Sequence, residues 1–267
     1  MTTFANQPLT RPQGGSAWLR PILVLLATVV VFTVNTLANT LPINGQTTGG
    51  VSDSFPVFFV PAGYVFAIWG VIYFGLLAYT IYQIRPSVQG ETTLRALAPW
   101  YLVTAAANSG WIVAWHYNQF PLSLAIMLVL LVALVMIYRL LAQEHTVAPG
   151  RWWALHLPFS IYLGWICVAT IANTTVVLYN AGWDGFGLSG PVWGAIMVAV
   201  ATLLGLLFSL LRADIALVAV FVWALAGIAV KYSGTPIMLY TASVGAVLLA
   251  LSLFLSVPAR NKRRVNG

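Results

Sequence analysis

Long apolar segments separated by short polar connections run along nearly the whole chain. Most hold roughly the twenty residues that a helix needs to cross a hydrocarbon layer about 30 Å thick. The pattern therefore predicts an all-α fold, a polytopic membrane helix bundle with about eight transmembrane helices. The predicted spans cover residues of about 19–41, 60–83, 97–117, 121–143, 153–179, 191–211, 215–230 and 236–257, the seventh being short.

Composition supports this interpretation and excludes a soluble domain. Hydrophobic residues make up 60% of the chain and charged residues 6%, against roughly 25% charged in soluble domains. The formal net charge of +7 comes from basic residues at segment ends and in the last eight positions. The positive-inside rule explains that placement without a nucleic-acid partner.

The same rule predicts the orientation. With the N-terminus in the cytoplasm and eight spans, eleven of the twelve Lys and Arg residues fall on the cytoplasmic side and Lys231 falls outside. Both termini are therefore expected to be cytoplasmic, in the cell (cytoplasmic or inner) membrane, with the lipid bilayer as the main partner. The first apolar segment is interpreted as a membrane anchor, because it is long for a signal peptide.

The chain divides into four predicted parts. Residues 1–17 are a flexible cytoplasmic tail, 18–180 a five-helix membrane core, 181–257 a three-helix membrane extension and 258–267 a basic cytoplasmic tail. The long connection at 42–59 is either a lid over the bundle mouth or a simple connector. Small residues line one face of the sixth and eighth spans, which are expected to pack against one side of the bundle or against a partner.

The second span, Pro61 to Gln83, carries an aromatic stripe. Proline suits the first turn of a helix, so Pro61 is expected to open this one. At about 100° per residue, Ala62, Phe66, Trp69 and Tyr73 fall on one face. This stripe is either plain helix packing or one wall of a site for a flat hydrophobic ligand.

Polar side chains accompany aromatic rings in the third and fifth spans. In the third, Asn108 shares a face with Trp111 and Trp115; in the fifth, Tyr162, Trp165, Ala169 and Asn173 share another. A side-chain amide in lipid is costly unless it is hydrogen-bonded, so both asparagines should face the interior or each other. They either tie helices together or belong to a ligand site.

Few residues are suited to catalysis or ion coupling. No Asp, Glu, Lys or Arg lies near the middle of a predicted span, which disfavours an ion-driven transporter. The three histidines lie near span ends, and His116 is interpreted as an interfacial hydrogen-bonding residue rather than a metal ligand. The single Cys167 excludes an internal disulfide. The sequence predicts no catalytic residue and no metal site, so an enzyme is not expected.

Three motifs occur in order in the first five spans, and together they resemble the translocator protein or tryptophan-rich sensory protein (TspO/MBR) family. The second span has Pro61-Ala62 and Trp69-x-x-x-Tyr73, the third has Asn108-x-x-Trp111 with Pro121 ten residues later, and the fifth has Tyr162-x-x-Trp165 with Ala169 and Asn173. The match covers residues of about 18–180. Gly63 and Tyr64 replace the first tryptophan of that family's second helix, and three further helices lie outside its five-helix core.

The resemblance implies an aromatic pocket between helices that takes porphyrins and other flat hydrophobic ligands, often in a homodimer. The predicted ligand-binding residues are Trp69, Tyr73, Asn108, Trp111, Tyr162, Trp165, Ala169 and Asn173.

The leading functional hypothesis is a non-enzymatic membrane protein that binds a hydrophobic, planar ligand for sensing, storage or passage. A tetrapyrrole such as a porphyrin, a carotenoid and a lipid all fit this description. Two alternatives stay open: an accessory subunit of a larger photosynthetic or respiratory membrane complex, and an uncoupled transporter.

Overall fold

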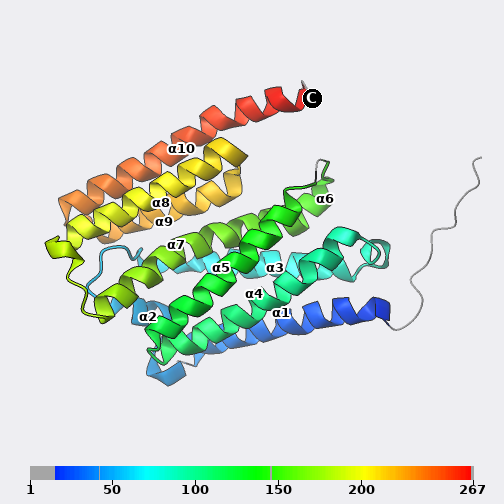
Figure 1. The fold of residues 1–267 in the computed structure, drawn as a ribbon, viewed down its shortest axis with the longest axis horizontal. Coiled ribbons are helices and arrows are strands. Elements are labelled where there is room, and N and C mark those ends of the chain that lie inside the picture. Colours follow the sequence, from blue (N-terminus) through cyan, green and yellow to red (C-terminus); the bar gives the residue numbers. More distant parts are fainter. Residues whose placement is uncertain (1–15, 42, 145, 266–267) are drawn as a thin grey trace, which may run out of the picture.

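The computed structural model describes residues 16–41, 43–144 and 146–265, and all its regular structure is helical. Eight long helices run up and down the bundle, joined by short connections (Figure 1). They are α1 (Ser16–Thr40), α3 (Ile68–Ile84), α4 (Thr92–His116), α5 (Phe120–Leu141), α7 (Leu157–Asn180), α8 (Gly190–Arg212), α9 (Ile215–Lys231) and α10 (Pro236–Val265). Two short α-helices, α2 (Thr48–Asp53) and α6 (Pro149–Arg151), lie in the connections.

These helices confirm the predicted all-α membrane bundle. Within the described ranges, six helices are long and apolar enough to cross a membrane by length and composition. The other two long helices are α9, which is apolar but has only 17 residues, and α4. Helix α4 is the more polar of the two, because it carries interior groups such as Thr104 and Asn108, both buried by neighbouring helices.

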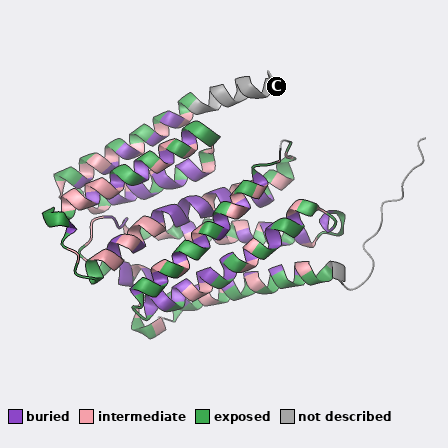
Figure 2. Ribbon diagram, viewed as in Figure 1, coloured by how far each residue is buried: buried purple, intermediate pink, exposed green. Residues whose placement is uncertain are grey.

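The helices form two adjoining groups. Helices α1, α3, α4, α5 and α7 pack against one another, while α8, α9 and α10 form a second group that contacts the first mainly through α7 and α9 (Figure 1). Large apolar side chains remain exposed on the outward faces of α1, α5, α8 and α10, whereas much of α4 and α7 is buried (Figure 2). Such faces are expected where helices meet lipid instead of water.

The small-residue faces of α8 and α10 pack against each other. A Cβ added at Gly205 would lie 2.8 Å from a methyl carbon of Leu249, and the Ser252 hydroxyl donates to the Ser209 hydroxyl oxygen at 2.8 Å. Small residues allow helices to approach closely in lipid. These faces are therefore occupied within the chain itself.

Glycine also sets the approach of the two groups. A Cβ at Gly164 of α7 would lie 2.9 Å from the carbonyl oxygen of Leu217 in α9, so the two backbones are nearly in contact. The Asp214 side chain caps α9 by accepting from the Leu217 N–H at 3.1 Å, and it also accepts from the Ser160 hydroxyl of α7 at 2.7 Å. The two helix groups are thus joined through both backbone proximity and a polar contact.

The structure corrects the start of the second predicted span. Pro61 and Ala62 lie just before the helical part of this span. The chain enters the span through a 3-10 helix, η2 (Gly63–Ala67), and α3 begins at Ile68. The Ala62 N–H donates to the Gly227 carbonyl oxygen at 3.2 Å, so this N–H bonds to α9 and not within its own span. The prediction that Pro61 opens the helix is therefore wrong.

The two predicted tails differ in how much of each the structure describes. The tail at 1–17 is described only from Ser16, where α1 begins. Helix α10 continues through Val265, so most of the predicted basic tail prolongs this helix.

Candidate functional site

Indole rings from three helices meet in the interior of the five-helix group. Trp69 of α3 lies edge-to-face with Trp165 of α7, with ring centroids 6.2 Å apart, and stacks on Tyr73 at 5.6 Å. Trp111 of α4 stacks on Trp115, one helical turn later, at 5.4 Å. The periodicity that placed these rings on particular helix faces therefore also brings them together in space.

These rings line a small cavity of about 40 Å³. Five of the eight predicted residues contribute to its wall. They are Trp69, Trp111, Trp165, Ala169 and Asn173. The remaining wall residues are Thr48, Ser52, Pro61, Phe66, Trp115, Val168 and Ala172. Of these, Phe66 and Trp115 lie on the aromatic faces noted in the sequence.

The long connection after α1 supplies part of this wall. Thr48 and Ser52 come from α2, and the Thr48 carbonyl oxygen accepts from the Trp115 indole N–H at 3.1 Å. The His116 carbonyl oxygen accepts from the side chains of Asn44 at 2.9 Å and Gln46 at 3.1 Å. The connection is therefore folded onto the end of α4 and covers the cavity, which favours the lid interpretation over that of a loose connector. In the sequence, the aromatic residues and glycines of this connection were the features that pointed to a folded lid.

Tyr73 lies beside the cavity instead of in its wall. It lines a neighbouring cavity of about 250 Å³ between α1, α2 and α3, together with Asn35, Asn39, Thr48, Gly49, Phe66, Trp69 and Ile112. Because Thr48, Phe66 and Trp69 border both cavities, these three side chains form the partition between them.

Asn108 and Tyr162 join helices and line neither cavity. Both are fully buried, and the Asn108 amide donates to the Tyr162 hydroxyl oxygen at 3.1 Å. The Asn108 carbonyl oxygen accepts from the Asn35 amide of α1 at 2.7 Å. This chain of bonds ties α1, α4 and α7 together, which is the structural interpretation of the interior asparagine.

Asn173 combines both roles. Its carbonyl oxygen accepts from the Trp111 indole N–H at 3.1 Å, and its amide donates to the Ser123 hydroxyl oxygen at 3.0 Å. It thus links α4, α5 and α7 while also lining the cavity. The two asparagines do not pair with each other.

Trp165 differs from the other cavity tryptophans. Its side chain is 3% exposed, and its indole Nε1 has no hydrogen-bond partner within the described part of the chain. A buried N–H without an acceptor is costly and uncommon in proteins. Trp165 also belongs to the cavity wall, so this donor lies in the side chain of a wall residue.

Helix α9 holds the segment that closes the cavity. The Trp223 indole N–H donates to the Val65 carbonyl oxygen at 3.1 Å, and the Tyr232 hydroxyl donates to the Val57 carbonyl oxygen at 2.7 Å. Lys231 forms an ion pair with Asp53 at the end of α2. The second helix group is therefore attached to the lid as well as to α7.

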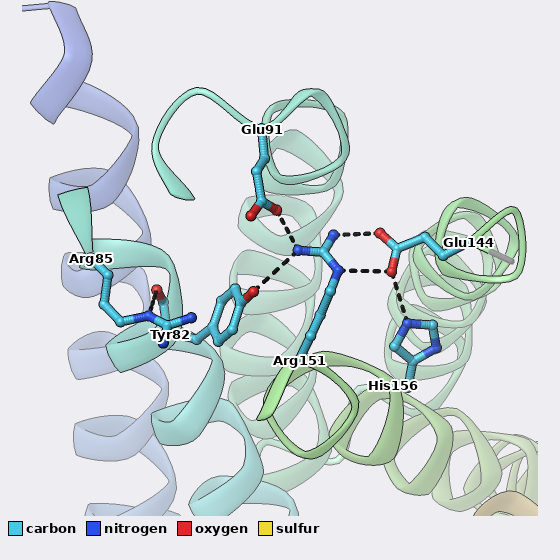
Figure 3. Close-up of polar contacts among 6 residues, drawn as sticks. All are labelled: Tyr82, Arg85, Glu91, Glu144, Arg151 and His156. Atoms are coloured by element: carbon cyan, nitrogen blue, oxygen red, sulfur yellow. Dashed lines mark hydrogen bonds and ion pairs between the residues drawn. The ribbon is translucent and has the colours of Figure 1, made fainter. Parts of the chain in front are cut away.

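A charged cluster lies at the opposite end of the bundle (Figure 3). Arg151 forms ion pairs with Glu91, just before α4, and with Glu144, just after α5, and Glu144 also contacts His156 at 3.0 Å. Burial disfavours the charged form of Glu144, but hydrogen bonds from Arg151 and His156 outweigh it and hold its pKa below 4.5. The cluster ties the ends of three helices together.

The remaining chemically active side chains are occupied or isolated. His116 is fully buried, with Nδ1 2.7 Å from the Ile112 carbonyl oxygen and Nε2 3.5 Å from the Thr48 hydroxyl. His145 lies outside the described residues. Among the described residues, no three His, Cys, Asp or Glu side chains are placed to hold a metal ion together, and Cys167 is a buried free thiol.

A family model described as TSPO-like protein matches residues 21–255. The chain belongs to this family. The resemblance drawn from three motifs in the sequence is therefore confirmed. The match also runs beyond residue 180, so the last three helices of this TSPO-like protein belong to the matched region and are not outside it. No curated protein and no solved structure matches the chain.

Membership makes this TSPO-like protein a multi-pass membrane protein in contact with the lipid bilayer. It also indicates a ligand-binding or transport-related role in the membrane, in a family that is generally non-enzymatic.

Proposed function

We propose that this TSPO-like protein is a non-enzymatic membrane protein that binds a hydrophobic, planar ligand between α3, α4 and α7. The observation that carries the proposal is the convergence of Trp69, Trp111 and Trp165 on one cavity, together with the buried, unpartnered indole N–H of the wall residue Trp165. Aromatic faces supply large apolar contact area, and a few placed polar groups orient a ligand.

The unpartnered donor narrows the chemical class of the ligand. A buried Trp165 N–H is best satisfied by a ligand with an acceptor atom, such as a carbonyl or carboxylate oxygen. Tetrapyrroles and lipids carry such atoms, whereas a hydrocarbon carotenoid would leave the N–H unpaired. Among the three classes considered, a tetrapyrrole fits best, because it is both planar and a hydrogen-bond acceptor.

The cavity must enlarge to accept such a molecule. Its volume of about 40 Å³ is far below the roughly 300–1,000 Å³ of small-molecule sites. Displacing Phe66 and Thr48 would merge it with the adjacent 250 Å³ cavity, because these side chains border both. We therefore interpret the structure as a closed form, with the lid and the segment around η2 as the parts that move.

The test is a titration of the purified full-length protein with protoporphyrin IX, followed by its absorbance and by quenching of its fluorescence. We expect saturable binding, and Trp165→Phe should raise Kd by about 2- to 13-fold, corresponding to the loss of one hydrogen bond worth about 0.5–1.5 kcal/mol. Trp153→Phe serves as the matched control. That residue is 63% exposed and lies at the opposite end of the bundle from the lid.

Two results would remove the proposal. One is the absence of saturable binding of protoporphyrin IX, together with the absence of any tetrapyrrole or lipid in mass spectra of the purified protein. The other is equal affinity of wild type, Trp165→Phe and Trp153→Phe.

The role of binding, in our proposal, is sensing, storage or passage of the ligand in the cytoplasmic membrane. The accessory-subunit alternative was motivated by small-residue faces on α8 and α10, but these faces contact each other inside the chain. These faces therefore give no reason to expect a partner protein at that surface. Ligand binding remains the better-supported function.

A further inference from the structure

A separate cavity of about 370 Å³ lies where α7 ends and α8 begins, between the five-helix group and the second group. Its volume is within the range of small-molecule sites, which often occur at boundaries between structural units. The segment after α2 forms one wall and the α7–α8 connection the other. The wall residues that the argument uses are Phe59, Tyr179, Trp183, Asp184, Gly190 and Trp193.

Two indoles make adjacent walls of this cavity. The rings of Trp183 and Trp193 are 4.6 Å apart between centroids and inclined at 75°, so one presents its face where the other presents its edge. Tyr179 adds a third ring to the lining. Faces of tryptophan and tyrosine attract cations that come within about 6 Å of the ring centroid.

An exposed carboxylate, that of Asp184, lines the same cavity as these rings. Charged side chains of the described residues at this end of the bundle are Asp53, Lys231 and Asp184. Asp53 pairs with Lys231, which leaves Asp184 without a cationic partner. One Asp184 oxygen accepts from the Phe186 N–H at 3.0 Å, which fixes the carboxylate in the loop beside Trp183.

We propose that this cavity binds an alkylammonium group, either a primary amine or a quaternary ammonium such as choline. The carboxylate of Asp184 would supply the opposite charge, and the indoles of Trp183 and Trp193 would cover the methyl or methylene groups. The N-terminus of α8 at Gly190 carries partial positive charge, so the ammonium is placed at the Asp184 end of the cavity.

Two sources share this chemistry: the headgroup of a membrane lipid and a free amine in the aqueous phase. The cavity lies at the end of the bundle, where aromatic side chains meet the headgroup region, and the neighbouring Phe186 is 79% exposed. Both sources can therefore reach it.

The experiment measures choline binding to the full-length protein in an uncharged maltoside detergent, by saturation-transfer NMR of the N-methyl protons. Wild type should show saturable binding, and 3,3-dimethylbutan-1-ol, the uncharged analogue of the same shape, should bind at least about tenfold more weakly. Asp184→Asn should weaken choline binding by about tenfold, which corresponds to about 1.4 kcal/mol. Trp193→Leu should weaken it several-fold.

Asp53→Asn is the matched control, because it removes one carboxylate from the same end of the bundle but outside this cavity. It should leave choline affinity within twofold. Equal binding of the charged ligand and its uncharged analogue would overturn the proposal, as would unchanged affinity in Asp184→Asn.

Nanodiscs distinguish the two sources. If the natural occupant is a lipid headgroup, free choline should bind in phosphatidylglycerol nanodiscs but not in phosphatidylcholine nanodiscs, where the headgroup already fills the cavity. If it is a free amine, choline should bind in both. Absence of binding in both lipids would refute the proposal. None of these readouts involves the Trp165 cavity, so this inference and the proposed function can fail separately.

Discussion

The sharpest structural prediction concerns Gly227 of α9, which lies against the segment that enters α3. An ideal Cβ at this position would lie 2.2 Å from a methyl carbon of Val65 and 3.3 Å from the Pro61 Cβ. Non-bonded carbons prefer separations of about 3.5–4.0 Å. Gly227→Ala therefore has to push α9 and the segment that enters α3 apart by more than about 1 Å, a shift estimated from that preferred separation.

The expected cost follows from what this shift breaks. Forcing an extra methyl group into a packed interior costs about 1–3 kcal/mol. The Ala62 N–H to Gly227 carbonyl bond at 3.2 Å would lengthen, at a further cost of about 0.5–1.5 kcal/mol. Alanine regains about 1 kcal/mol of helix propensity over glycine. The net expectation is a loss of about 0.5–3.5 kcal/mol of stability.

Gly70→Ala is the matched control, because Gly70 is an exposed residue of α3 with no heavy atom within 4 Å of an added Cβ. It should be neutral or stabilising by up to about 1 kcal/mol. Unfolding of each variant by SDS in mixed micelles, followed by far-ultraviolet circular dichroism, gives the comparison. If Gly227→Ala were as stable as Gly70→Ala, the close contact between α9 and the segment that enters α3 would be refuted.

Two further predictions test individual polar groups. Trp111→Phe removes the indole N–H that donates to Asn173, so it should destabilise the protein by about 0.5–1.5 kcal/mol in the same SDS assay. Trp165→Phe should not, because the Trp165 N–H has no partner to lose. Equal effects of the two substitutions would contradict the assigned hydrogen bonds. Burial opposes ionisation of Glu144, but hydrogen bonding led by Arg151 lowers its pKa below 4.5, so the folded state releases this proton more readily than the unfolded state. The stability that Glu144 contributes should therefore be complete above about pH 4.5 and be lost as the pH falls through its lowered pKa, and Glu144→Gln should flatten this part of the stability profile. A wild-type profile no steeper than that of Glu144→Gln in thermal melts at different pH values would show that the carboxylate is not stabilised by the fold.

The candidate site illustrates how far helix periodicity reaches. Spacing placed Trp69, Trp111 and Trp165 on polar or aromatic faces, and such faces turn inward because lipid cannot satisfy their polar groups. Spacing did not say which partner each polar group would find. Asn108 bonds to Asn35, which the sequence argument did not consider, and Trp165 bonds to none within the described chain.

The role of the last three helices shows the same limit. Their apolar length predicted spans, and their small residues predicted close packing, which occurs between α8 and α10. Their attachment to the segment that enters α3 depends on contacts such as Trp223 to Val65, which join residues 158 positions apart. A pattern of local periodicity carries no information about a pairing so distant along the chain.

The sequence by itself determined that this protein is an all-helical membrane bundle, because segment length and lack of charge leave few alternatives in lipid. Its three motifs indicated the TSPO-like family. It also determined which rings and amides face the interior, since these follow from about 3.6 residues per turn. Only the tertiary structure decided that the aromatic rings share one small cavity, that α9 holds its lid and that Asp184 and two indoles line a second cavity. Those features depend on how rigid helices rotate and approach one another, which is settled by packing between distant segments.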